Sequence, residues 1–74
     1  MNRTEFIEEL IDYFEDFTPE NTPKRVKAYE LVLSDSIDYD QLYMLMLKNY
    51  KSFKYAPTPA DLLQILKNRY QSFY

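Results

Sequence analysis

The sequence predicts an all-α fold, a small four-helix bundle-like domain covering residues 1–74. Apolar residues make up 46% of the chain and aromatic residues 18%, which is enough to build a core at this length. Apolar side chains recur at helical spacing in four segments, and no segment alternates as a strand does. Short turns, most of them marked by proline, separate the segments and predict close helical neighbours.

The first helix is predicted over residues 4–17. Asn2 or Thr4 can cap its start, and early glutamates suit the positive end of the helix dipole. Its core-facing stripe consists of Phe6, Ile7, Leu10, Ile11, Phe14 and Phe17.

The second helix is predicted over residues 23–34, with Thr22 as its cap and Pro23 at its first position. Its apolar positions are Val26, Tyr29, Val32 and Leu33. Three bases occupy its first turn, which is the unfavourable end of the dipole for a cation: Lys24, Arg25 and Lys27. We expect them to meet acids of the first helix; the alternative is contact with a phosphate or an acidic partner.

The third helix is predicted over residues 39–53, because the segment that begins at Asp38 has the spacing of a capping box. Residues 42–47 are apolar all the way round the helix, which is unusual for a surface helix. We expect a central, buried position for this helix; the alternative is that part of it faces a partner.

The fourth helix is predicted over residues 59–73, with an apolar set made of Leu62, Leu63, Ile65, Leu66, Tyr70 and Phe73. Its start lies in residues 54–63, here called the junction segment. Pro57 disfavours a helical conformation before it, and Thr58 can cap the helix. Pro59 has the φ angle of a first helical residue, and Asp61 can accept a bond from the N–H of the cap.

Cys, His and Gly are all missing from the chain. Thiolate zinc sites and histidine base catalysis are therefore excluded, as are glycine-rich phosphate-binding loops. The remaining option is a pair of carboxylates, but the acids of the first helix are spaced as on a solvated helix face. We therefore expect no enzymatic activity, no cofactor and no metal.

Charge is distributed unevenly along the chain, although the net charge is only −3. Residues 1–20 contain seven acids and one base, whereas residues 41–74 contain five bases and one acid. The expected explanation is that the first helix pairs with the last; the alternative is an acidic face for a basic partner. No apolar run reaches 18 residues and no signal peptide is recognised, so we expect a cytoplasmic protein without membrane contact.

The order of these parts resembles the N-terminal helical domain of the replicative-helicase loader and inhibitor proteins of phages of Gram-positive bacteria. The likeness covers about residues 4–66. It rests on the acidic amphipathic first helix, on Val26 and Tyr29 in the second, on the Leu-rich third, and on Tyr-Ala-Pro-Thr-Pro-Ala-Asp-Leu at 55–62. Family members typically have Pro-Pro-Thr followed by Ile, where this chain has Ala56 and Pro59.

The resemblance implies a non-enzymatic adaptor in the host cytoplasm that engages the hexameric replicative helicase or its loader protein, blocking the helicase or helping to deliver it to an origin. An origin-binding protein is a further candidate partner. In the family, helicase contact is assigned largely to a region after the helical domain. This chain has a short tail there, which is compatible with an inhibitor, with a domain of a longer protein or with a different target.

Exposed aromatic and arginine side chains are the usual anchors of interfaces. On this ground the candidate partner-binding residues are Tyr55, Arg69, Tyr70, Phe73 and Tyr74. Core packing is the alternative for Tyr70 and Phe73, and a frayed end is the alternative for Tyr74.

Two other functions are compatible with the sequence. Residues 48–55 interleave lysines and aromatics as single-strand binders do, but the acidic first third argues against nucleic acid as a partner. The acids of residues 5–20 could instead mimic nucleic acid, so that the protein would inhibit another nucleic-acid enzyme of the host, such as a defence nuclease.

Overall fold

Four helices form the protein, and the all-α fold class predicted from the sequence is confirmed. The computed structural model describes residues 1–50 and 54–71, with side chains up to residue 68. The helices are α1 (Arg3–Tyr13), α2 (Thr22–Val32), α3 (Tyr39–Asn49) and α4 (Pro59–Gln71). The described residues contain no strand.

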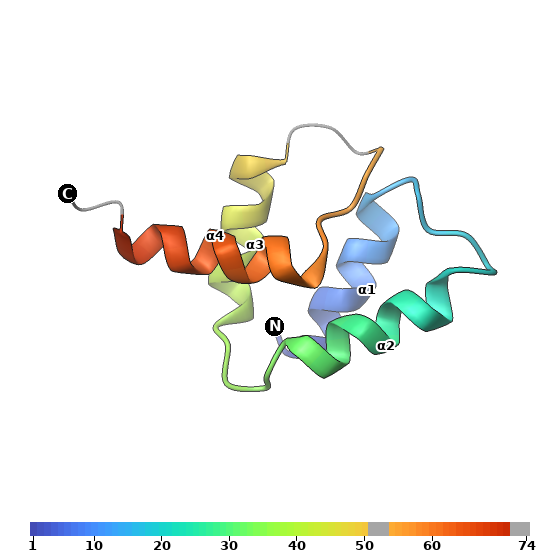
Figure 1. Ribbon diagram of the computed structural model, residues 1–74, viewed down its shortest axis with the longest axis horizontal. Coiled ribbons are helices and arrows are strands. Elements are labelled where there is room, and N and C mark those ends of the chain that lie inside the picture. Colours follow the sequence, from blue (N-terminus) through green and yellow to red (C-terminus); the bar gives the residue numbers. More distant parts are fainter. Residues whose placement is uncertain (51–53, 72–74) are drawn as a thin grey trace.

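The helices lie in two layers that cross (Figure 1). In one layer α1 packs beside α3, and in the other α2 packs beside α4. Between the layers α1 contacts α2, and α3 contacts α4. Among the described residues the backbones of α1 and α4 do not approach each other closely, so these two helices are diagonal to each other.

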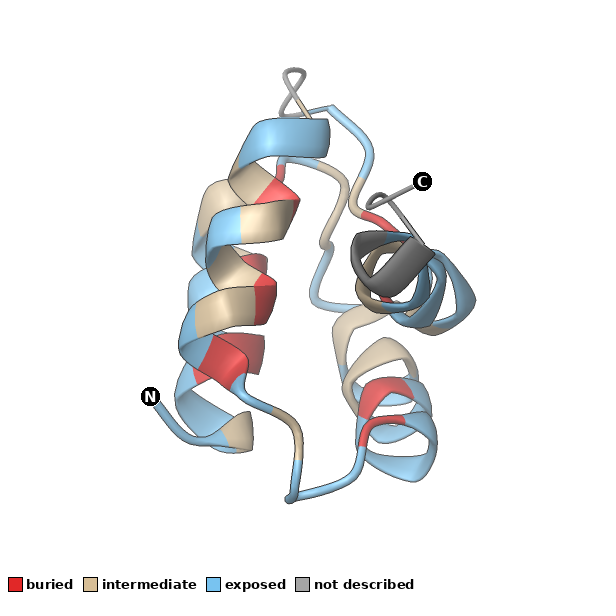
Figure 2. Ribbon diagram, turned by 90° about the vertical axis from the view of Figure 1, so that its left-hand side faces the viewer, coloured by how far each residue is buried: buried red, intermediate tan, exposed pale blue. Residues whose placement is uncertain are grey.

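The core lies between the layers, where buried positions gather on the sides of the helices that face one another (Figure 2). The layer of α1 and α3 supplies most of it. The fully or nearly fully buried side chains in the described residues are Phe6, Ile7, Leu10, Phe14, Tyr29, Leu33, Tyr39, Leu42, Met46, Pro57 and Leu62. The rings of Phe6 and Tyr39 have centroids 5.4 Å apart and join α1 to α3.

The helix starts follow the sequence closely. Asn2 caps α1 in a complete capping box with Glu5, and Asp38 caps α3 by accepting from the Gln41 N–H at 3.1 Å. Thr22 differs from its predicted role as a cap, because it is the first residue of α2 and its hydroxyl donates to the Thr18 carbonyl at 2.6 Å.

Three helices end earlier than predicted. Helix α1 stops at Tyr13 instead of residue 17, α2 stops at Val32 instead of residue 34, and α3 stops at Asn49 instead of residue 53. The residues after α1 and α2, Phe14 and Leu33, are extended, and both side chains enter the core. Burial of these two side chains therefore sets where these two helices end. Predicted helical residues 51–53 and 72–73 lie outside the described residues.

Candidate functional site

The junction segment begins α4 as the sequence predicts. The N–H of Asp61 donates to the Thr58 hydroxyl at 3.1 Å, and the N–H of Thr58 donates to the Asp61 carboxylate at 3.0 Å. Pro59 is the first residue of the helix. These reciprocal bonds form a capping box, so Thr58 and Asp61 both have a local structural role.

Pro57 attaches the junction segment to α2. Its side chain is fully buried, and its carbonyl accepts a hydrogen bond from the Tyr29 hydroxyl. Burial raises the pKa of Tyr29 above its usual value, an effect that the nearby Arg25 partly offsets. The tyrosine of α2 and the proline of the junction are therefore in direct contact.

Asp16 attaches the residue before Pro57 to the turn after α1. Its carboxylate accepts from the Ala56 N–H at 3.1 Å and pairs with the Arg25 guanidinium at 3.2 Å. The same guanidinium lies 3.9 Å from the ring centroid of Phe17. Arg25 thus meets an acid of residues 4–17 as expected, although that acid lies beyond the end of α1. Lys24 and Lys27 are exposed.

Tyr55 differs from these neighbours because 74% of its surface is exposed. Of the five predicted partner-binding residues, it is the one whose side chain is described. Arg69 and Tyr70 lie in α4, where the structure describes their backbone but not their side chains. Phe73 and Tyr74 lie outside the described residues.

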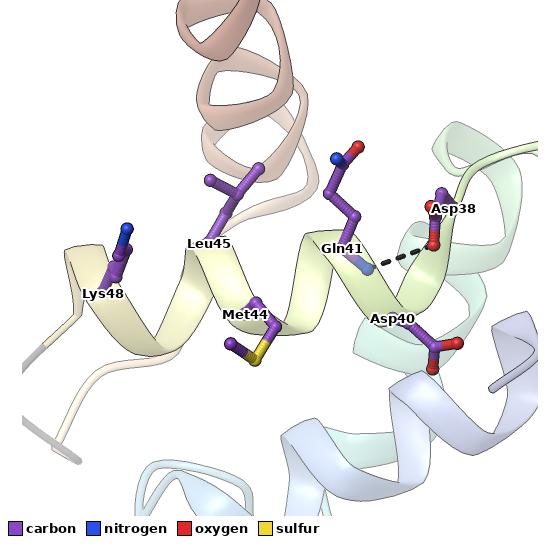
Figure 3. Close-up of a pocket in the computed structure, with 6 residues that line it drawn as sticks. All are labelled: Asp38, Asp40, Gln41, Met44, Leu45 and Lys48. Atoms are coloured by element: carbon purple, nitrogen blue, oxygen red, sulfur yellow. Dashed lines mark hydrogen bonds between the residues drawn. The ribbon is translucent and has the colours of Figure 1, made fainter.

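A hollow of about 460 Å³ opens on the side of α3 that faces away from the core (Figure 3). It is lined by Asp38, Asp40, Gln41, Met44, Leu45 and Lys48, and we call it the α3 hollow. Met44 is 63% exposed, whereas Leu42 and Met46 of the same apolar run are fully buried. The sequence indicated an unusual apolar run here but did not predict the hollow.

The two ends of the α3 hollow carry opposite charges. Asp38 and Asp40 lie at the N-terminal end of α3, and Lys48 lies one turn beyond Met44 at the other end. The ammonium group of Met1 contacts one oxygen of Asp40 at 2.5 Å, which raises the pKa of this amine. The Asp40 side chain nevertheless stays 76% exposed.

The acidic face of α1 is open to solvent. Glu8, Glu9, Asp12 and Glu15, the last just after the helix, are all exposed, and no ion pair joins any of them to a base among the described residues. The expected pairing of the first helix with the last is therefore not found among the described side chains, because α1 and α4 occupy diagonal positions in the fold.

Tyr55, the α3 hollow and the acidic face of α1 are all exposed, so each of them can contact another molecule. The described residues contain no group of three acidic side chains placed to hold a metal ion. Within that part of the chain, no helix is both long and apolar enough to cross a membrane. Comparisons with protein-family models, with curated proteins and with solved structures find no match.

Proposed function

We propose that the protein is a non-enzymatic phage adaptor that binds the hexameric replicative helicase of its host, or the helicase-loading machinery, and inhibits or loads the helicase. The proposal rests on the family resemblance and on one observation in the structure. Tyr55, the aromatic residue that opens the family-like motif, is 74% exposed.

The neighbours of Tyr55 strengthen this argument. Pro57 and Leu62 are buried, and Thr58 and Asp61 bond to each other. Each of these residues is explained by the fold, whereas an exposed tyrosine next to a fixed loop is not. A large aromatic side chain next to a segment that hydrogen bonds hold in place is a favourable interface anchor, because less conformational freedom is lost when it binds.

Binding of purified replicative helicases from several Gram-positive bacteria to the immobilised protein tests the proposal. We expect at least one helicase to bind, with a change in its ATPase rate or in its recruitment to an origin. Replacing Tyr55 by Ala should weaken this binding by about 2 kcal/mol, roughly thirtyfold, as for an interface hot spot.

Leu31→Ala is the matched control, because Leu31 is 79% exposed on α2, away from the junction. It should leave helicase affinity unchanged. Failure of every helicase to bind, or an equal loss in both variants, would count against the proposal.

The open acidic face of α1 supports a second candidate, an inhibitor that presents carboxylates to a basic nucleic-acid enzyme. The triple change of Glu8, Asp12 and Glu15 to their amides distinguishes the two functions. It should abolish inhibition under the second candidate and leave helicase binding largely intact under the first.

A further inference from the structure

One ridge of α3 carries an acid, an apolar residue and a base at successive helical turns. Asp40, Met44 and Lys48 are four residues apart, so they follow one another along the surface of the helix. All three are exposed and all three line the α3 hollow. Figure 3 shows Met44 between the two charged residues along the helix.

We propose that this surface docks onto the same surface of a second copy of the chain, forming a dimer with two-fold symmetry. The argument is charge complementarity. A two-fold axis that passes Met44 at right angles to α3 makes the two α3 helices antiparallel, and the acidic end of one then faces the basic end of the other.

The spacing of the ridge matches this symmetry. Asp40 and Lys48 are each about 6 Å along the helix from Met44, in opposite directions. The axis therefore places Lys48 of each copy opposite Asp40 of the other, and it brings the two Met44 side chains together. Both ion pairs form at once, which a parallel arrangement would prevent by placing like charges together.

The groups on the ridge are available for this contact. Lys48 has no ion pair with an acid in the part of the chain that the structure describes. The Met1 ammonium contacts Oδ1 of Asp40, but the Asp40 side chain stays 76% exposed and can accept a second cation from the other copy. Met44 adds an adaptable apolar side chain at the centre, as methionine does at many interfaces.

Sedimentation equilibrium of the full chain tests the proposal across concentrations from about 10 µM to about 1 mM. The surface is small and half polar, so we expect reversible association with a Kd on the order of 100 µM. The 9.0 kDa chain should approach twice its mass at the highest concentration.

Charge exchange makes the test specific for this symmetry. Lys48→Asp and Asp40→Lys should each weaken the dimer about tenfold or more, because each change creates two like-charge contacts. A one-to-one mixture of these two variants should associate at least as tightly as the original protein, since every contact across the axis is complementary again. The double variant D40K/K48D should also dimerise.

Lys27→Asp is the matched control, because it makes the same change of charge at an exposed position of α2. It should leave dimerisation unchanged, and circular dichroism should show that every variant keeps its helices. A monomer at all concentrations overturns the proposal, as does a dimer that Lys48→Asp leaves intact or that Lys27→Asp weakens equally. If the chain is monomeric and Lys48→Asp loses helicase binding, the α3 hollow belongs to the helicase partner.

Discussion

The two sides of α3 use the same residue type in opposite ways. Met46 is fully buried against the core, and Met44, two residues earlier, is 63% exposed in the α3 hollow. Both belong to one apolar run, so hydrophobicity does not separate them. What separates them is which neighbours reach each side, because α1 and α4 both pack on α3 but leave one face open.

Two tyrosines at the junction segment show the same contrast between a buried and an exposed side chain. Tyr29 is 2% exposed and donates to the Pro57 carbonyl, whereas Tyr55 is 74% exposed two residues before that proline. The buried member of each pair holds the fold together, and the exposed member is available to another molecule. Substitutions on the two sides should therefore affect different measurements.

The methionine pair should give the largest difference in stability. Met46→Ala leaves a cavity in the core and should lower the free energy of unfolding by about 2–5 kcal/mol. Met44→Ala, the control, should change it by less than about 0.5 kcal/mol. Urea unfolding followed by circular dichroism measures both, and similar losses would contradict the assignment of inner and outer faces.

Tyr29→Phe should have the next largest effect. It removes the hydroxyl but keeps the ring, so the buried carbonyl of Pro57 loses its donor. We expect a loss of about 1–3 kcal/mol in the free energy of unfolding. Tyr55→Phe, which removes the same atom from an exposed ring, is the control and should leave stability unchanged.

Tyr29 should also make stability depend on alkaline pH. Burial raises the pKa of Tyr29 in the folded state, so above about pH 10 the unfolded chain loses the proton first. The stabilisation is complete below this pH and is lost as pH rises through the folded pKa. Tyr29→Phe should make the decline less steep in denaturant titrations, while burial of Tyr39 preserves part of it.

Thr58→Ala should have a smaller effect, since it removes one cap at the start of α4. We expect a loss of about 1 kcal/mol in the free energy of unfolding. Thr4→Ala is the control, because Thr4 is exposed inside α1 and caps nothing. Equal losses in the two thermal unfolding curves would show that the capping box contributes little.

Tyr55→Ala should have the smallest effect on stability, less than about 0.5 kcal/mol, because its side chain is mostly in water. Its effect on helicase affinity should be large. A variant that unfolds more easily would assign Tyr55 to the fold instead of to a partner surface.

Helix starts were more predictable from the sequence than helix ends. Asn2, Asp38 and Thr58 cap through bonds to residues three positions later, so the sequence alone contains both partners. The ends have no such local signal, because the chain has no glycine and no described residue has a positive φ. Phe14, Leu33 and Tyr50 end their helices in extended conformations instead.

The surface was only partly predictable for a related reason. Exposure of Tyr55 was expected from residue type, and the structure places it on the surface. The α3 hollow depends on which side of α3 the other helices cover, and no local pattern encodes this. The predicted pairing of the first helix with the last is not found among the described side chains, because sequence distance does not tell which helices become diagonal.

The sequence by itself determined the all-α class, the four helices and the capping residues, because these follow from helical periodicity and from bonds within a few positions. The tertiary structure decided which side of α3 is buried, where α1 and α2 end, and which charges remain unpaired. Those outcomes depend on contacts between residues far apart in the chain, such as Tyr29 with Pro57 and Asp16 with Ala56. Packing decides them because an apolar side chain is stabilised only where another helix covers it.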